Sequence, residues 1–310
     1  MVRSIFLLST LILLCLITNA QAKFEVEQIV NKNMELIRQG EPVDEQLSIV
    51  CQPSNFENLI KICSNYSIDT LPQIRKQVVR YLAISALKST DVSVRISMVN
   101  ILLQKCFDEN SGIVISACNY LKQFGISDYD SSANVLLDSV LRTVKFNKND
   151  IYKLGAYVGN KATEVLLFNK LSTAKSKSEI WHLNLALCRR QNEKAVTYVL
   201  ENLKPAKINS DFIYAVVPDL IYTRQPRIYD FLFEIIQNPE YKCVSGNPDN
   251  EKEIECGYYL IELLANEIEG FPLAVNQFGE IENEITPISI NTVREWYKVN
   301  KNFRIITNKY

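Results

Sequence analysis

The chain has 310 residues, with 34 lysines and arginines against 35 aspartates and glutamates, so its net charge is close to zero. A nucleic-acid-binding protein usually carries a basic stripe, and no long block of like charge occurs here. Apolar residues make up 47% of the chain, which excludes general disorder. Glycine makes up about 3% of the chain, 9 of 310 residues, against an average of ~7%. This low content disfavours folds rich in tight hairpins or phosphate-binding loops.

The first 22 residues have the pattern of a secretory signal peptide. Arg3 precedes an apolar run from Ile5 to Ile17, and Ala20-Gln21-Ala22 fits the small-x-small rule for cleavage. The run is short for a membrane span, which needs about 20 apolar residues, although a retained anchor is the alternative. We therefore expect residues 1–22 to be removed and the mature protein, starting at Lys23, to be secreted or periplasmic.

A nine-residue pattern then returns at intervals of 19 or 20 residues, in segments 74–82, 94–102, 113–121 and 133–141. Positions 1, 5, 6 and 9 of each segment are apolar, except for Asp138 in the fourth. These spacings lie on one stripe of a helix and do not fit the alternation of a strand. Val79 and Val99 are therefore expected at equivalent buried positions of successive helices.

The turns between these segments contain helix-starting residues. Asp91 and Ser111 are predicted N-caps, because their side-chain oxygens can accept a hydrogen bond from a free main-chain N–H. Pro72 lies near a helix start, where its missing N–H has no cost. Each interval thus predicts one helix and one turn, and two intervals make a helical hairpin of roughly 40 residues.

The second half continues with a longer interval of 32 or 33 residues, between segments 165–171, 197–203 and 230–236. Residues 179–190 and 211–222 are also predicted helices, and Pro218 should kink the second of these or mark its last turn. Together these patterns predict an all-α protein with about twelve or thirteen helices and no strand.

Residues 91–95, Asp-Val-Ser-Val-Arg, resemble the D-x-x-V-R signature of HEAT repeats, and Arg75 repeats the arginine of that signature. The segment 292–305 is similar to a tryptophan-rich closing helix of secreted bacterial HEAT-like proteins. The resemblance implies a right-handed α-solenoid of HEAT- or armadillo-like antiparallel helix pairs, whose curved surface binds a partner and which has no catalytic residues. It also implies a polar ladder between repeats, with members Asp91, Arg95 and Arg75.

On this basis we expect a helical repeat array over residues 23–270, followed by a loop and a capping helix over 271–310. The expected function is that of a protein- or peptide-binding scaffold without catalytic activity. The partner would bind along one face of the solenoid. No cofactor, nucleic acid or membrane insertion of the mature chain is expected.

Seven cysteines follow the predicted signal peptide, and six of them form near pairs. Outside the cytosol, disulfides are the expected use. Cys243 and Cys256 flank a polar stretch that can bring its ends together, so we predict a disulfide there, worth about 3 kcal/mol in the loop-entropy model. The other pairs leave two alternatives open, a disulfide or buried free thiols: Cys51 with Cys63, and Cys106 with Cys118.

Few residues indicate catalysis. His182 and Cys188 are six residues apart, which places them ~240° apart around a helix, so they cannot act as base and nucleophile together. Cys188 is expected in the core. Glu282 and Glu284 could instead serve as paired carboxylates of a carbohydrate-active enzyme on a helical toroid. That class is the alternative to the binding scaffold.

Overall fold

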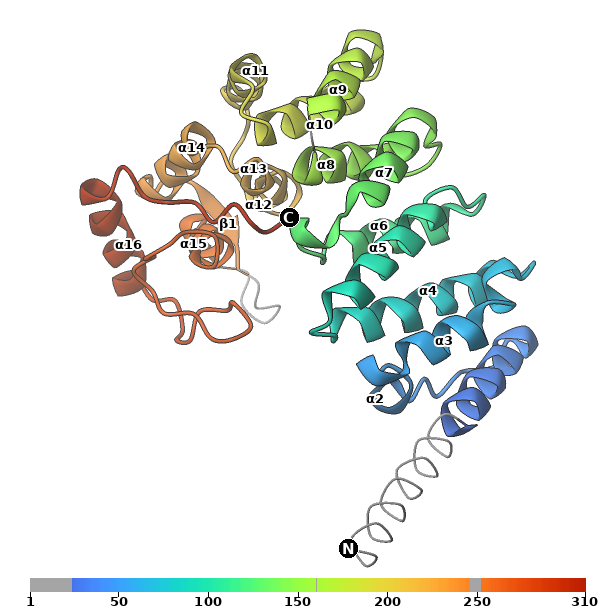
Figure 1. The fold of residues 1–310 in the computed structure, drawn as a ribbon. Coiled ribbons are helices and arrows are strands. Elements are labelled where there is room, and N and C mark those ends of the chain that lie inside the picture. Colours follow the sequence, from blue (N-terminus) through green and yellow to red (C-terminus); the bar gives the residue numbers. More distant parts are fainter. Residues whose placement is uncertain (1–23, 160, 246–251) are drawn as a thin grey trace, which may run out of the picture. The chain divides into compact units, whose positions relative to one another are not determined.

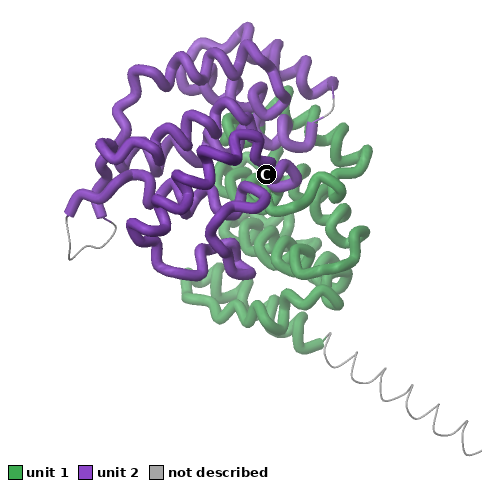
Figure 2. Tube along the Cα trace, turned by 90° about the vertical axis from the view of Figure 1, so that its left-hand side faces the viewer, with its two compact units in different colours: residues 1–151 green, residues 152–310 purple. Residues whose placement is uncertain are grey.

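The computed structural model describes residues 24–159, 161–245 and 252–310, and the chain is mostly helical (Figure 1). It divides into two compact units, Met1–Ile151 and Tyr152–Tyr310, coloured separately in Figure 2. Residues 271–310, the expected loop and capping helix, belong to the second unit.

The described part of the first unit consists of helices and short 3-10 turns. A helix covers residues 24–39. The elements that follow are α2 (Leu47–Val50), η1 (Pro53–Asn55), α3 (Phe56–Cys63), η2 (Tyr66–Ile68), α4 (Pro72–Leu87), α5 (Val92–Lys105), α6 (Ser111–Leu121), η3 (Ile126–Asp128) and α7 (Ser131–Thr143). The next helix, α8 (Lys148–Val158), contains the boundary between the units.

Helices of the first unit pack on the next helix and on the next but one. Thus α4 contacts α5 and α6, and α5 contacts α6 and α7. The predicted stripe provides these contacts: Val79 and Val99 are both fully buried, whereas Lys76 is exposed. In α7, Asp138 interrupts the apolar stripe and is half-buried, and Val140, two residues later, is buried in the core. The predicted burial of Val79 and Val99 is confirmed.

The helix starts agree in part with the predicted caps. Pro72 is the first residue of α4, and Asp91 caps α5 by accepting a hydrogen bond of 2.8 Å from the main-chain N–H of Ser93. The prediction of Ser111 as a cap was wrong. Asn110 has the extended backbone of an N-cap and accepts from Gly112 N at 3.0 Å, so Ser111 is already inside the helix.

The second unit contains α9 (Lys161–Thr173), α10 (Lys177–Arg189), α11 (Glu193–Leu203), α12 (Ser210–Ala215), α13 (Val217–Tyr222), α14 (Pro226–Gln237), β1 (Lys242–Val244), β2 (Glu253–Glu255), α15 (Gly257–Ala265) and α16 (Pro287–Val299). The strands form a short antiparallel hairpin in which Cys243 is opposite Ile254. The sequence predicted no strand, because each strand has only three residues and is too short for a period-two pattern.

The predicted helix over 211–222 is broken at Val216, and Pro218 lies in the first turn of α13. A proline lacks the N–H that a helix interior requires but is accepted in the first turn. Of the two predicted alternatives, the interruption of the helix at Pro218 agrees with the structure, whereas the position in a last turn was wrong. This break is one reason why the described residues form more helices than the twelve or thirteen predicted.

The last helix, α16, packs on α14 and α15. The rings of Phe233 and Tyr297 stack with centroids 4.1 Å apart, and Phe303 lies 5.2 Å from Phe233. Trp296 closes the same aromatic cluster, 6.1 Å from Phe303. The cluster holds the chain after α16 against the second unit as far as Phe303.

Candidate functional site

An extended segment, residues 304–310, follows this aromatic cluster and crosses the second unit near α12 and α13 (Figure 1). Its second, third and fourth residues, Ile305, Ile306 and Thr307, are β-branched, and such residues favour extended backbone. Ile305 forms an antiparallel bridge with Ile268, in the loop after α15. Two main-chain hydrogen bonds of 2.9 Å flank this bridge, from Glu269 N to Arg304 O and from Ile306 N to Glu267 O. The start of the segment is thus held by an isolated strand-like bridge.

Arg189, the last residue of α10, holds the segment through its main chain. Its guanidinium donates to the carbonyl oxygens of Thr307 at 2.8 Å and Lys309 at 2.6 Å. A third bond goes to the carbonyl of Tyr222 at 2.8 Å, and the group lies 5.4 Å from the ring centre of Tyr157. Burial lowers the pKa of Arg189, but an arginine stays charged in proteins. The Arg189 guanidinium therefore binds main-chain carbonyl groups, which every peptide has.

Arg224 provides a second cation in the loop between α13 and α14. Its backbone has φ 55°, in the left-handed region that favours glycine, so the side chain's contacts must offset the cost of this conformation. The guanidinium forms an ion pair with Glu267, donates to Tyr229 Oη at 2.8 Å and donates to the main-chain oxygen of Tyr310 at 3.2 Å. The ion pair with Glu267 also connects Arg224 to the loop 266–269, which forms the antiparallel bridge with Ile305.

The ring of Tyr310 occupies an aromatic pocket. Its centroid is 5.0 Å from that of Tyr222 and 5.5 Å from that of Tyr157. Tyr157 donates to the carbonyl of Asn308 at 3.2 Å, and Tyr222 donates to the carbonyl of Lys153 at 2.6 Å. Burial raises the pKa of Tyr222, so its hydroxyl stays a donor at ordinary pH. We call these surroundings of residues 304–310, formed by Tyr157, Arg189, Tyr222, Arg224 and the loop 266–269, the tail groove.

An ionic cluster lies next to Tyr222. Lys153 Nζ is 2.7 Å from one carboxylate oxygen of Asp219, and His182 Nδ1 is 3.4 Å from the other. The Lys153 ammonium also lies 5.9 Å from the Tyr222 ring centre. His182 therefore faces Asp219, and Cys188 is buried, with a pKa that burial raises to about 12. Among the described residues, no group of His, Cys, Asp and Glu side chains could hold a metal ion.

The arginines expected in a ladder do form one along the first unit. Arg75 Nη2 is 2.8 Å from Asp108 Oδ1, and Arg95 Nε is 2.9 Å from Asp128 Oδ1. In each pair the carboxylate lies 33 residues further along, in the turn of the following hairpin. Each guanidinium also donates to a carbonyl in the turn before its own helix, at 2.6 and 2.9 Å. The rungs therefore connect alternate turns: the turn before α4 with the turn before α6, and the turn before α5 with the turn before α7.

Asp91 is not a member of this ladder. Its Oδ1 accepts from both the main-chain N–H and the hydroxyl of Ser93, at 2.8 and 2.7 Å. Through these bonds the Asp91 carboxylate caps the N-terminus of α5. The aspartate of the D-x-x-V-R pattern thus caps a helix, whereas Asp128 is the partner of Arg95.

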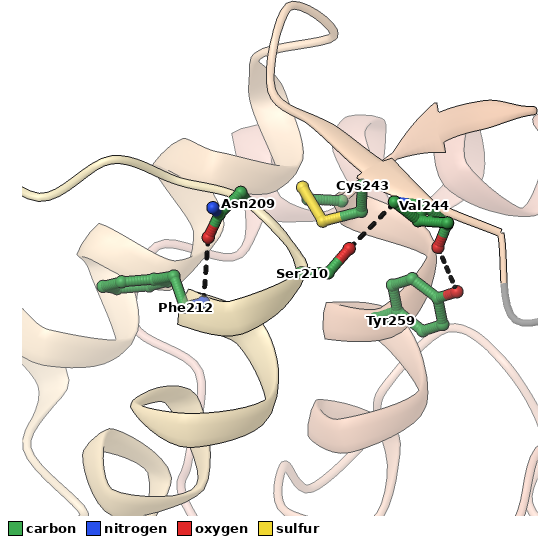
Figure 3. The surroundings of a disulfide bond; sticks show 7 residues. Asn209, Ser210, Phe212, Cys243, Val244 and Tyr259 are labelled. Atoms are coloured by element: carbon green, nitrogen blue, oxygen red, sulfur yellow. Dashed lines mark hydrogen bonds between the residues drawn. A yellow bond between two sulfur atoms is a disulfide. The ribbon is translucent and has the colours of Figure 1, made fainter.

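The predicted Cys243–Cys256 disulfide is present, with Cα atoms 5.0 Å apart (Figure 3). Next to it, the main-chain N–H of Val244 donates to Ser210 Oγ at 2.8 Å, and Tyr259 Oη donates to the Val244 carbonyl at 2.7 Å. These bonds tie the hairpin to α12 and α15. The loop residues 246–251 lie outside the described residues.

The other near pairs are not bridged in the structure. Cys51, Cys63, Cys106 and Cys118 are buried free thiols, which corresponds to the second of the two alternatives. The Cys106 thiol donates to the carbonyl of Leu102, one turn earlier in α5, at 3.5 Å. Burial raises the pKa of Cys51 to about 11 and that of Cys63 to about 12. All four thiols fill core space, and their raised pKa values keep Cys51 and Cys63 protonated.

The carboxylates that the carbohydrate-active alternative would use line a cavity of about 570 Å³. Glu282 and Glu284 share this cavity with Glu262 and Glu280. Burial raises the pKa of Glu262. Trp296 is packed in the aromatic cluster and is not among the residues that line the cavity. The cavity therefore has carboxylates but lacks a tryptophan platform for a sugar ring.

Sequence reasoning missed the tail groove. The groove and the segment in it join residues as many as 151 positions apart, as in the Tyr157–Asn308 bond, and no motif unites them. The high tyrosine count, 15, was the only signal. Searches of family models, curated proteins and solved structures find no match to the chain. Within the described ranges, no helix is long and apolar enough to cross a membrane.

Proposed function

We propose that this protein is a HEAT-like, right-handed α-solenoid that binds extended peptide segments of a protein partner and has no catalytic activity of its own. The observation that carries the proposal is the tail groove, which holds an extended segment mainly through main-chain atoms. Packing of α4 on α6 and of α5 on α7 supports stacked hairpins. The Arg75 and Arg95 rungs support a repeat in which each turn is tied to the next but one.

The groove combines the two components of peptide recognition by strand addition. Main-chain hydrogen bonds supply affinity that is tolerant of sequence, and a side-chain pocket supplies specificity. Arg189 and the loop 266–269 provide the first component. Tyr157 and Tyr222 provide the second, a pocket that fits an aromatic side chain.

We also propose that the mature protein works outside the cytosol. The Cys243–Cys256 disulfide supports an oxidising compartment, and the pattern of residues 1–22 supports export. Sequencing the N-terminus of material recovered from the secreting host should give Lys23 or a close neighbour. A product that retains Met1 would contradict export by cleavage.

A display library of random twelve-residue peptides tests the binding function. The full chain should enrich peptides that share an aromatic residue, and Arg189→Gln should weaken their binding by about tenfold or more, since a charge-assisted bond contributes about 1.5–3 kcal/mol. The matched control is Arg227→Gln, because the Arg227 side chain is 55% exposed and pairs only at the surface. Enrichment that Arg189→Gln leaves unchanged would refute the groove as the site.

The carbohydrate-active alternative has its own test. Incubation of the chain with a panel of polysaccharides should give no reducing ends above background. Turnover that disappears in Glu282→Gln or Glu284→Gln would overturn the binding proposal and identify the acidic cavity as an active site.

A further inference from the structure

We propose that residues 304–310 are an exchangeable occupant of the tail groove, and that the partner is an extended peptide whose aromatic side chain replaces that of Tyr310. The inference rests on the proposed function and adds two statements to it. The groove is closed in cis by the chain's own tail, and an outside peptide must displace that tail to bind.

The tail's contacts demand little of its sequence. Arg189 and the loop 266–269 bond to main-chain atoms of the tail. The side chains of Thr307 and Asn308 are exposed. Lys309 contributes one side-chain bond, from Nζ to a main-chain carbonyl at 2.7 Å. Arg304 pairs with Glu269 at 3.2 Å, and Ile305 and Ile306 are half-buried. The Tyr310 ring packs against two tyrosine rings. Another peptide with an extended backbone, apolar residues at its start and one aromatic side chain would therefore make most of the same contacts.

The tail also leaves part of the groove unsatisfied. Arg224 Nε is buried and has no hydrogen-bond partner among the described residues. A buried donor without an acceptor has a substantial cost. A peptide whose acceptor reaches this atom would gain a bond that the tail does not make.

The tail can leave without disturbing the core that precedes it. Phe303 is held by Phe233, Tyr229 and Trp296, with ring centroids 5.2 to 6.3 Å away. Arg304, the next residue, is exposed. The division between the packed aromatic cluster and the tail thus falls at residues 303 and 304. Release beyond this point breaks only the tail's own contacts with the groove.

The test uses the full chain and a fluorescent synthetic peptide with the sequence of residues 303–310 as the probe. Tyr310→Ala weakens the tail in cis but leaves the groove and the probe intact. Fluorescence anisotropy should show that Tyr310→Ala binds the probe about tenfold or more tightly than the wild type, because the probe now competes against a tail without its ring. Tyr198→Ala in α11 is the matched control and should bind the probe as the wild type does.

A second readout follows the tail directly. The amide N–H of Ile306 is bonded to the Glu267 carbonyl, so its hydrogen exchange reports whether the tail is docked. Saturating unlabelled probe should accelerate exchange of the Ile306 amide in Tyr310→Ala, whereas a probe with alanine in place of its tyrosine should not. Thermal melts of each variant show that it is folded.

The outcomes separate the two proposals. Equal affinity of the wild type and Tyr310→Ala for the probe would refute the tail as a competitor, although library peptides that depend on Arg189 would still support peptide binding. Tight probe binding by Tyr310→Ala with no library peptide enriched would support the exchangeable tail but refute binding of foreign peptides. Absence of probe binding by every folded variant would overturn the exchangeable tail.

Discussion

Removing the Arg95 rung should destabilise the first unit locally and measurably. The Asp128 side chain is only 5% exposed and accepts from Arg95 Nε at 2.9 Å and from Gly125 N at 3.0 Å. Arg95→Gln leaves this carboxylate buried with a main-chain donor but without its cation. Breaking a buried ion pair typically costs about 3–5 kcal/mol. Since the Arg95 side chain is 22% exposed and the Gly125 bond persists, we expect about 2–4 kcal/mol.

Native-state hydrogen exchange of the amides in α5, α6 and α7 is the suitable assay, because it measures the free energy of opening of this region in the full chain. The matched control is Arg227→Gln in the second unit. Arg227 Nη1 lies 3.3 Å from Glu193 Oε2, and the Glu193 side chain is 79% exposed. Such an exposed ion pair contributes about 0–1 kcal/mol to stability. The double variant Arg95→Gln/Asp128→Asn should recover part of the loss, since it removes the unpaired charge.

The ladder argument would be refuted if Arg95→Gln lowered the opening free energy of α5 by no more than Arg227→Gln lowers that of α14. It would also be contradicted if the double variant were destabilised by the sum of its single changes, because that result means no coupling between Arg95 and Asp128.

Three further predictions concern pH, the disulfide and the thiols. Burial pushes the pKa of Asp108 up, but Arg75, the main-chain N–H of Asn110 and Lys105 together outweigh it and hold that pKa below its ordinary value. This stabilisation should be present above about pH 4 and lost as pH falls through the folded pKa, and a urea-midpoint curve whose acid limb is as steep in Asp108→Asn as in the wild type would contradict it. Replacing Cys243 and Cys256 by serine should lower the unfolding free energy in urea melts by about 2–3 kcal/mol, because they close a loop with a sequence separation of 13, and an unchanged midpoint would count against this. Iodoacetamide at pH 8 should label no thiol before denaturation, as mass spectrometry can check, and fast native labelling would disprove burial of these residues: Cys51, Cys63, Cys106, Cys118 and Cys188.

Features that depend on neighbours along the chain were predictable from the sequence. The spacing of apolar residues identified the helices and the buried positions of Val79 and Val99, because one stripe of a helix must face the core. Pro72 and Asp91 marked helix starts through their own backbone chemistry. The loop between Cys243 and Cys256 is short enough that its ends meet wherever the rest of the chain lies.

Features that join distant residues were decided only by the tertiary structure. Arg95 could be recognised as a ladder residue, but its partner proved to be Asp128, 33 residues away, because helix packing brings that turn within reach. The tail groove combines Tyr157 and Arg189 with a segment up to 151 residues further along. Such a site depends on how helices cross and where their ends meet. These geometric relations leave no periodic trace in the sequence, so only the folded chain reveals them.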